Sequence, residues 1–129
     1  MSDPMFSGKR LSAFLFVGLM GFGVDLAAFI LLQLVFREPL VARIGASSIA
    51  ILATWILNRR LTFGKVDFSG AGPELVKYVL TSALGASANF AAFAIAYHLY
   101  PSLPLAYVCG TGSGLFVNYV GYNRFVYSK

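Results

Sequence analysis

A single carboxylate lies near the middle of the longest apolar run of the chain. That run, LSAFLFVGLMGFGVDLAAFILLQLVF, extends from Leu11 to Phe36, and Asp25 is its one charged residue. A charge at the middle of a membrane-spanning helix is costly and usually faces a cavity or a partner. Asp25 is therefore a candidate proton or substrate site. The alternative is a hydrogen-bonded or protonated side chain that fixes helix packing.

Two other polar residues fall within apolar runs and could share a membrane interior with Asp25. Arg43 lies about one turn inside the second run, where it can extend to the surface, point inward toward Asp25, or meet an anionic headgroup. Asn89 lies in the third run, 64 residues after Asp25. Polar groups at equivalent depths predict a shared interior seam.

A second kind of chemistry is indicated where two apolar runs end. The segment Asn58-Arg59-Arg60-Leu-Thr-Phe63 combines amide, arginine and aromatic residues, and the same combination recurs between Asn118 and Tyr127. The planar fork of arginine suits phosphate oxygens, and asparagine can satisfy sugar hydroxyls or helix-end carbonyls. Alternatively, the arginines set topology and bind anionic lipid, at about 1 kcal/mol each. The candidate substrate-binding residues are Asp25, Asn89, Arg43, Asn58, Arg59, Arg60, Asn118, Asn123, Arg124 and Lys77.

The composition is that of an integral membrane protein. Charged residues make up 12% of the 129 residues and hydrophobic ones 58%, whereas soluble domains carry about 25% charged residues. The net charge of +5 comes from basic residues at the ends of apolar runs. That distribution is typical of membrane topology and argues against a nucleic-acid partner.

No combination of residues typical of a catalytic centre is present. The chain has one cysteine, Cys109, and one histidine, His98. It lacks Ser-His-Asp, Cys-His, HExxH and paired-carboxylate arrangements. We therefore expect no enzyme activity, no metal and no cofactor, and an intramolecular disulfide is excluded.

The apolar runs predict four transmembrane helices in a single domain spanning residues 1–129. Strands of a membrane barrel would alternate apolar and polar residues, but these runs are continuous. The predicted spans are residues 11–36, 40–58, 75–99 and 105–123, with turns at Arg37-Glu38-Pro39 and Tyr100–Pro104 and a loop at residues 59–74. Of the ten Lys and Arg residues, eight fall on the side of the termini and this loop. The positive-inside rule places that side in the cytoplasm.

The two halves of the chain are related by an internal repeat. A shift of 64 residues places Gly21 on Gly85, Asp25 on Asn89 and Arg60 on Arg124 without a gap. Each half is then one helical hairpin, and the two hairpins have the same orientation in the membrane.

These motifs together resemble the GtrA-like family of small four-span membrane proteins. The resemblance covers about Arg10 to Tyr127. Its motifs are Phe14-Leu-Phe-Val-Gly18 followed by Gly21 and Asp25, Asn58–Phe63, Lys77-Tyr-Val, and Asn118-Tyr through Arg124-Phe-Val-Tyr127. Thr54, where the family often has an asparagine, and Leu61, where a bulky aromatic is common, depart from the pattern.

The resemblance implies a role in cell-surface polysaccharide synthesis, as a multi-pass protein of the inner (plasma) membrane. Such a protein would translocate a polyprenyl-phosphate-linked sugar, with anionic lipids, a membrane glycosyltransferase and a second copy of the chain as possible partners. One alternative is a non-transporting accessory subunit that anchors a glycosyltransferase. Another is a small proton-coupled exporter, against which the fixed orientation argues.

Overall fold

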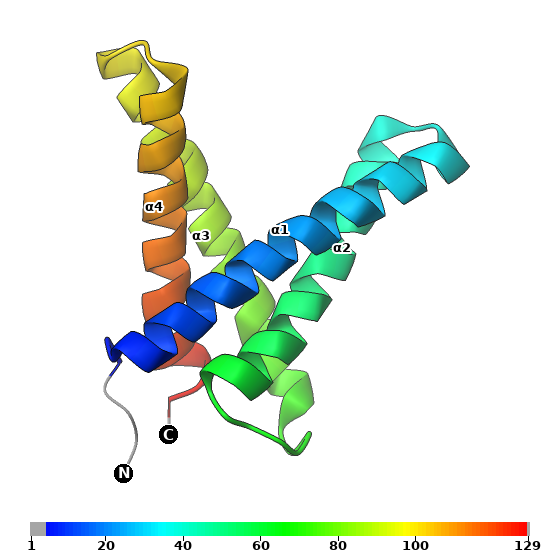
Figure 1. The fold of residues 1–129 in the computed structure, drawn as a ribbon, viewed down its shortest axis with the longest axis vertical. Coiled ribbons are helices and arrows are strands. Elements are labelled where there is room, and N and C mark those ends of the chain that lie inside the picture. The colour runs from blue at the N-terminus through cyan, green and yellow to red at the C-terminus, as the bar shows by residue number, and fades with distance from the viewer. Residues whose placement is uncertain (1–4, 129) are drawn as a thin grey trace. The chain divides into compact units, whose positions relative to one another are not determined.

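The described part of the chain, residues 5–128 of the computed structural model, is helical apart from its turns and one loop. In order along the chain the elements are α1 (Gly8–Phe36), α2 (Pro39–Leu57), the π-helical turn η1 (Asn58–Thr62), α3 (Ala71–Leu99), α4 (Leu103–Gly121) and the π-helical turn η2 (Tyr122–Val126). The chain forms two compact units that divide between Ser69 and Gly70. Each unit is a pair of helices packed side by side and closed by a short turn (Figure 1). Long apolar runs form helices in lipid because a helix satisfies all of its own backbone hydrogen bonds.

Three segments among the described residues are long and apolar enough to cross a membrane. They are Gly8–Phe36, Pro39–Thr62 and Ala71–Leu99. The helices α1 and α3 have 29 residues each, or about 43 Å at 1.5 Å per residue, which exceeds the roughly 30 Å of a hydrocarbon core. The prediction of an all-helical membrane protein is thus confirmed. That α4 also spans the membrane stays a prediction, because the run Gly110-Thr-Gly-Ser-Gly114 lowers its apolarity.

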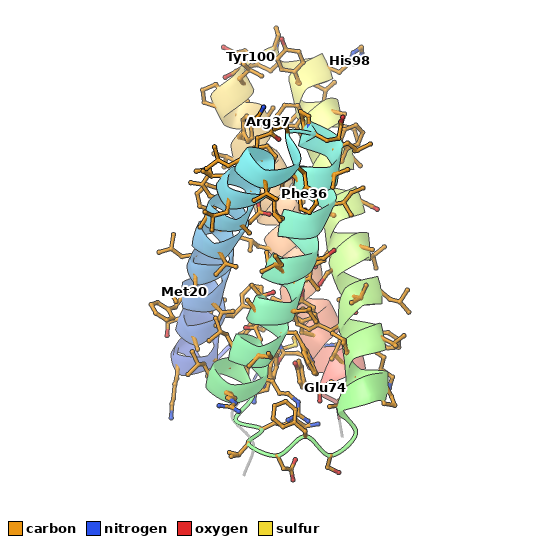
Figure 2. The ribbon with its side chains drawn as sticks, turned by 90° about the vertical axis from the view of Figure 1, so that its right-hand side faces the viewer. Met20, Phe36, Arg37, Glu74, His98 and Tyr100 are labelled. Carbon is orange, nitrogen blue, oxygen red and sulfur yellow. The ribbon has the colours of Figure 1, made fainter. Side chains whose placement is uncertain are left out.

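The two predicted hairpin turns are confirmed. At the end of α1, Arg37 adopts a left-handed conformation (φ 56°), and its N–H donates to the carbonyl of Gln33. Pro39 then begins α2, a position where its missing N–H costs nothing. In the second hairpin the Ser102 hydroxyl caps α4 by accepting from the N–H of Leu105 (3.4 Å). Figure 2 shows Phe36 and Arg37 at the closed end of the first hairpin, and His98 and Tyr100 at the closed end of the second.

The predicted loop at residues 59–74 is too long. Residues 58–62 continue the second helix as η1, and α3 already begins at Ala71. The loop proper lies between two glycines, Gly64 (φ 66°) and Gly70 (φ 70°), whose left-handed backbone favours glycine. Arginines and polar residues do not end a helix by themselves. The charged residues of this segment therefore do not mark where the loop begins and ends.

The 64-residue interval of the sequence is also the interval of the structure. The bounds of α4 and η2 follow those of α2 and η1 by 64 residues at both ends. Gly21 packs against the side chain of Thr54, and Gly85 packs in the same way against Asn118. Each pair lies 64 residues from the other, so the same point of close helix approach occurs in both hairpins.

Candidate functional site

The first hairpin holds an ion pair between its two helices. The Nη2 of Arg43 on α2 donates to the Oδ2 of Asp25 on α1 at 3.0 Å. The Asp25 side chain is 22% exposed and the Arg43 side chain 54%. Of the three orientations open to Arg43 from sequence, the structure has the one that points toward Asp25.

Arg43 reaches Asp25 along one face of α1. Its guanidinium carbon lies 5.8 Å from the ring centroid of Phe29, one helical turn beyond Asp25. A further turn along the same face is Gln33, whose Oε1 is buried without a hydrogen-bond partner, as is the Oδ1 of Asp25. Gln33 is not among the residues predicted above, but its spacing of four and eight residues from Phe29 and Asp25 places it on their face of the helix.

Pairing explains how both charges are tolerated in an apolar hairpin. An isolated carboxylate or guanidinium in hydrocarbon is expensive, and a partner of opposite charge offsets much of that cost. Three apolar residues next to the pair along the chain, Leu26, Ile30 and Ile44, are about half exposed or more. The pair therefore lies beside a surface suited to lipid chains.

Asn89, the repeat counterpart of Asp25, is a packing residue in the second hairpin. A Cβ on Gly110 would come within 2.6 Å of the Asn89 Oδ1, and one on Gly114 would come within 3.0 Å of the Asn89 Cβ. The two glycines let α4 approach α3 at this side chain. Asp25 and Asn89 thus occupy equivalent positions with different surroundings.

The motif at Asn58 folds into the π-helical turn η1. The N–H of Phe63 donates to the carbonyl of Asn58, five residues earlier (2.9 Å), and the Thr62 hydroxyl donates to the Asn58 Oδ1 (2.7 Å). Asn58 and Thr62 are both buried. Turns of this kind are often found at functional sites, but here the amide group is engaged within the turn.

Arg59 secures the loop that follows η1. Its side chain is 1% exposed and donates through Nη2 to the carbonyl of Ser69 (3.2 Å), with the guanidinium 5.2 Å from the Phe68 ring centroid. The neighbouring Arg60 is exposed and lies 5.8 Å from the same ring. Of the two arginines, Arg60 is the one that a phosphate can reach in this structure.

The equivalent motif of the second hairpin forms η2. The N–H of Tyr127 donates to the carbonyl of Tyr122 (2.8 Å), and the Asn123 Nδ2 donates to the carbonyl of Tyr119 (2.7 Å). Asn118 packs on Gly85, and its Oδ1 is buried without a hydrogen-bond partner. In this hairpin Asn123 donates to a helix-end carbonyl, and Asn118 packs between the helices.

Basic side chains remain at the surface at this end of the second hairpin. Arg124 is exposed, and Lys77 is exposed with its ammonium group 5.5 Å from the ring centroid of Phe125. Phe125 is itself 50% exposed. A cationic surface with an aromatic face can bind phosphate oxygens and apolar chains together.

Within residues 5–128 no group of three His, Cys, Asp or Glu side chains could hold a metal ion. The candidate residues fall into three kinds. Asp25 and Arg43 form an ion pair, Arg60, Lys77 and Arg124 are exposed cations, and the others are engaged in packing or helix-end contacts, namely Asn58, Arg59, Asn89, Asn118 and Asn123.

The model of the GtrA/DPMS transmembrane domain matches residues 13–127, which is nearly the whole chain. No curated protein matched the sequence.

Proposed function

Because the chain belongs to the GtrA/DPMS transmembrane-domain family, a family of membrane proteins in glycan and polyprenyl-sugar processes, we propose that it translocates a polyprenyl-phosphate-linked sugar across the membrane. The proposal includes four membrane-spanning helices, both termini in the cytoplasm, and residence in the inner membrane. Neither an enzymatic step nor a cofactor is part of it.

The observation that carries the proposal is the ion pair of Asp25 and Arg43. A translocation route for a polar headgroup needs polar groups within the membrane-spanning part of the protein, and such groups are otherwise too costly to keep there. This pair lies between two helices that are each long and apolar enough to cross the bilayer. The lipid chain of the substrate would stay among the exposed apolar side chains beside it.

The exposed cations at the open ends of the hairpins support a first contact with the lipid phosphate. Arg60 and Arg124 occupy equivalent repeat positions, and each is exposed. Anionic lipids would bind to the same surfaces. Arg59 would act indirectly, by securing the loop beside Arg60.

The test is translocation of a labelled polyprenyl-phosphate sugar in proteoliposomes that contain the purified chain alone. Asp25→Asn should lower the rate to that of empty vesicles. Asp67→Asn, which makes the same chemical change in the loop, should leave it unchanged. Equal rates in wild type and empty vesicles, with orientation and folding verified, would remove the proposal.

A second function, anchoring of a membrane glycosyltransferase, is favoured by one observation. Leu61 and Phe125, which follow Arg60 and Arg124 in the repeat, are 52% and 50% exposed. An exposed apolar residue beside an arginine at both helix ends could dock a partner protein. In that case Arg60→Ala with Leu61→Ser should abolish co-purification with the transferase, while Asp25→Asn should leave it intact.

A homodimer is compatible with either function, since four helices are few to enclose a polar path. Cross-linking of the purified chain in detergent would detect it. An exporter function would need insertion in both orientations, which reporter fusions to the C-terminus would reveal.

A further inference from the structure

Arg43 has donor capacity beyond its contact with Asp25. A guanidinium carries five N–H donors, and in the part of the chain that the structure describes Arg43 has a single hydrogen bond, through Nη2 to Asp25. Its side chain is more than half exposed. Its exposed donors can therefore reach a second anion, which competes with Asp25 for the one positive charge of the guanidinium.

The surroundings of Arg43 favour an anion that carries a lipid chain. Leu40, Val41 and Ile44 on α2 are exposed by 67%, 47% and 61%. The segment lies in a helix long and apolar enough to span the bilayer. A lipid phosphate reaches this position, about one turn inside the helix, with its chain already among these apolar side chains, whereas a small water-soluble anion gains nothing from them.

Asp25 would lose its counter-ion if Arg43 turned to such a phosphate. The helix α1 packs against α2 and η1, and Arg43 is the charged residue that faces Asp25 from α2. The other charges of these elements, Arg59 and Arg60 in η1 and Lys9 and Arg10 in the first turn of α1, lie far along the helices from Asp25. A carboxylate left alone in an apolar hairpin is far more costly than a neutral carboxylic acid.

We propose that Arg43 binds the phosphodiester of a membrane lipid and that Asp25, released from Arg43, takes up one proton from water as the lipid binds. The carboxylate becomes a carboxylic acid, and Arg43 keeps its charge. One anion and one proton enter the site together, so its net charge does not change. This neutrality lets the loaded site exist in the hydrocarbon, and it couples the movement of the anion to that of a proton. The identity of the lipid as a polyprenyl-linked sugar rests on the proposed function.

The exchange can be measured on the purified full-length chain in maltoside detergent. A farnesyl phosphodiester of glucose is added in weakly buffered solution containing a pH indicator, and binding and proton uptake are measured on the same sample. A diester is used because a phosphate monoester itself titrates near pH 6. Wild type should take up about one proton per lipid bound.

The variants separate the roles of the two residues. Asp25→Asn should still bind the lipid but take up no proton. Arg43→Gln should weaken binding at least tenfold, and so should the double variant Asp25→Asn/Arg43→Gln, which leaves no unpaired charge to disturb folding. Arg37→Gln, at the exposed hairpin turn, should match wild type. Binding by wild type without proton uptake, uptake that persists in Asp25→Asn, or undiminished binding by the double variant would each overturn the exchange.

Two further ligands identify the source of the phosphate. Proton uptake with phosphatidylglycerol equal to that with the farnesyl diester supports the site and makes ordinary anionic lipid its ligand. Equal proton uptake with dimethyl phosphate, which has no lipid chain, overturns the proposal that the ligand is a lipid. Proton-linked binding without translocation in proteoliposomes would leave the exchange standing and remove the proposed function. Translocation without proton uptake would support the proposed function and overturn the exchange.

Discussion

The two hairpins share one backbone plan and differ in the chemistry built on it. In the first, Arg43 extends over Phe29 to Asp25. In the second, the equivalent position of Arg43 is Tyr107, whose ring meets Phe93 edge to face at 5.2 Å. The aromatic partner is kept at the same place, while the charged pair is replaced by an aromatic residue and an amide.

The open ends of the hairpins differ in a similar way. In the first, Asn58 and Arg59 are buried, and Arg59 contacts the loop. In the second, Tyr122 takes the place of Asn58, stacks on Tyr78 with centroids 4.3 Å apart, and shares a hydrogen bond of 2.6 Å with the Ser82 hydroxyl. Both ends still form a π-helical turn. The comparison indicates that the geometry belongs to the repeat, whereas the ion pair between the helices belongs to the first hairpin.

The largest effect is expected from giving the first hairpin the side chains of the second. Asp25→Asn with Arg43→Tyr copies Asn89 and Tyr107 and leaves no unpaired charge. Translocation in proteoliposomes should fall to the level of empty vesicles, while the far-UV circular dichroism stays that of wild type. A double variant that translocates at the wild-type rate would show that the ion pair is not what distinguishes the hairpins.

Removal of Arg59 should cause the largest loss of stability. Arg59→Ala removes a charged hydrogen bond to Ser69 and the contact with Phe68, and should lower the free energy of unfolding by about 3 kcal/mol. Denaturation in detergent followed by the fluorescence of the single Trp55 measures it in the first hairpin. The matched variant Arg60→Ala, at an exposed site, should cost less than about 1 kcal/mol, and equal losses would contradict the structure.

A side chain at Gly85, where the two helices of the second hairpin approach closely, should lower the free energy of unfolding somewhat less than Arg59→Ala does. A methyl group at Gly85 collides with the Asn118 amide, so Gly85→Ala should destabilise the second hairpin by about 2 kcal/mol. Gly23→Ala, where the space is open, is the control and should cost nothing. Adding Asn118→Ala to Gly85→Ala should restore part of the loss, and no restoration would argue against this contact as the cause.

The smallest effect is expected at Tyr122. Tyr122→Phe keeps the stack on Tyr78 but loses the side-chain hydrogen bonds of the hydroxyl to Ser82 and to Tyr78, at a cost of about 1.5 kcal/mol. Thermal unfolding by circular dichroism would detect it. Ser82→Ala should cost less, because it removes only the bond to Tyr122, and the double variant should cost little more than Tyr122→Phe alone, because that bond is already lost there. Additive losses would mean that each hydroxyl has a different partner.

Much of the fold could be predicted because it depends on length and order along the chain. The apolar runs, the prolines after Arg37 and Tyr100 and the 64-residue interval predicted the helices, the hairpin turns and the repeat. The boundary at Arg59 could not be predicted in this way, because a buried arginine and an exposed one look alike in a sequence.

The sequence by itself determined that the chain is helical, that it belongs in a membrane, and that Asp25 is its one charge deep in an apolar run. Only the tertiary structure decided that Arg43 points toward Asp25, that Asn89 packs on glycines, and that Arg59 is buried beside the exposed Arg60. The physical reason is that helices apolar on every side have no polar face to indicate their rotation. Which residues of two such helices meet is decided by packing, and at these points by small residues such as Gly21 and Gly85.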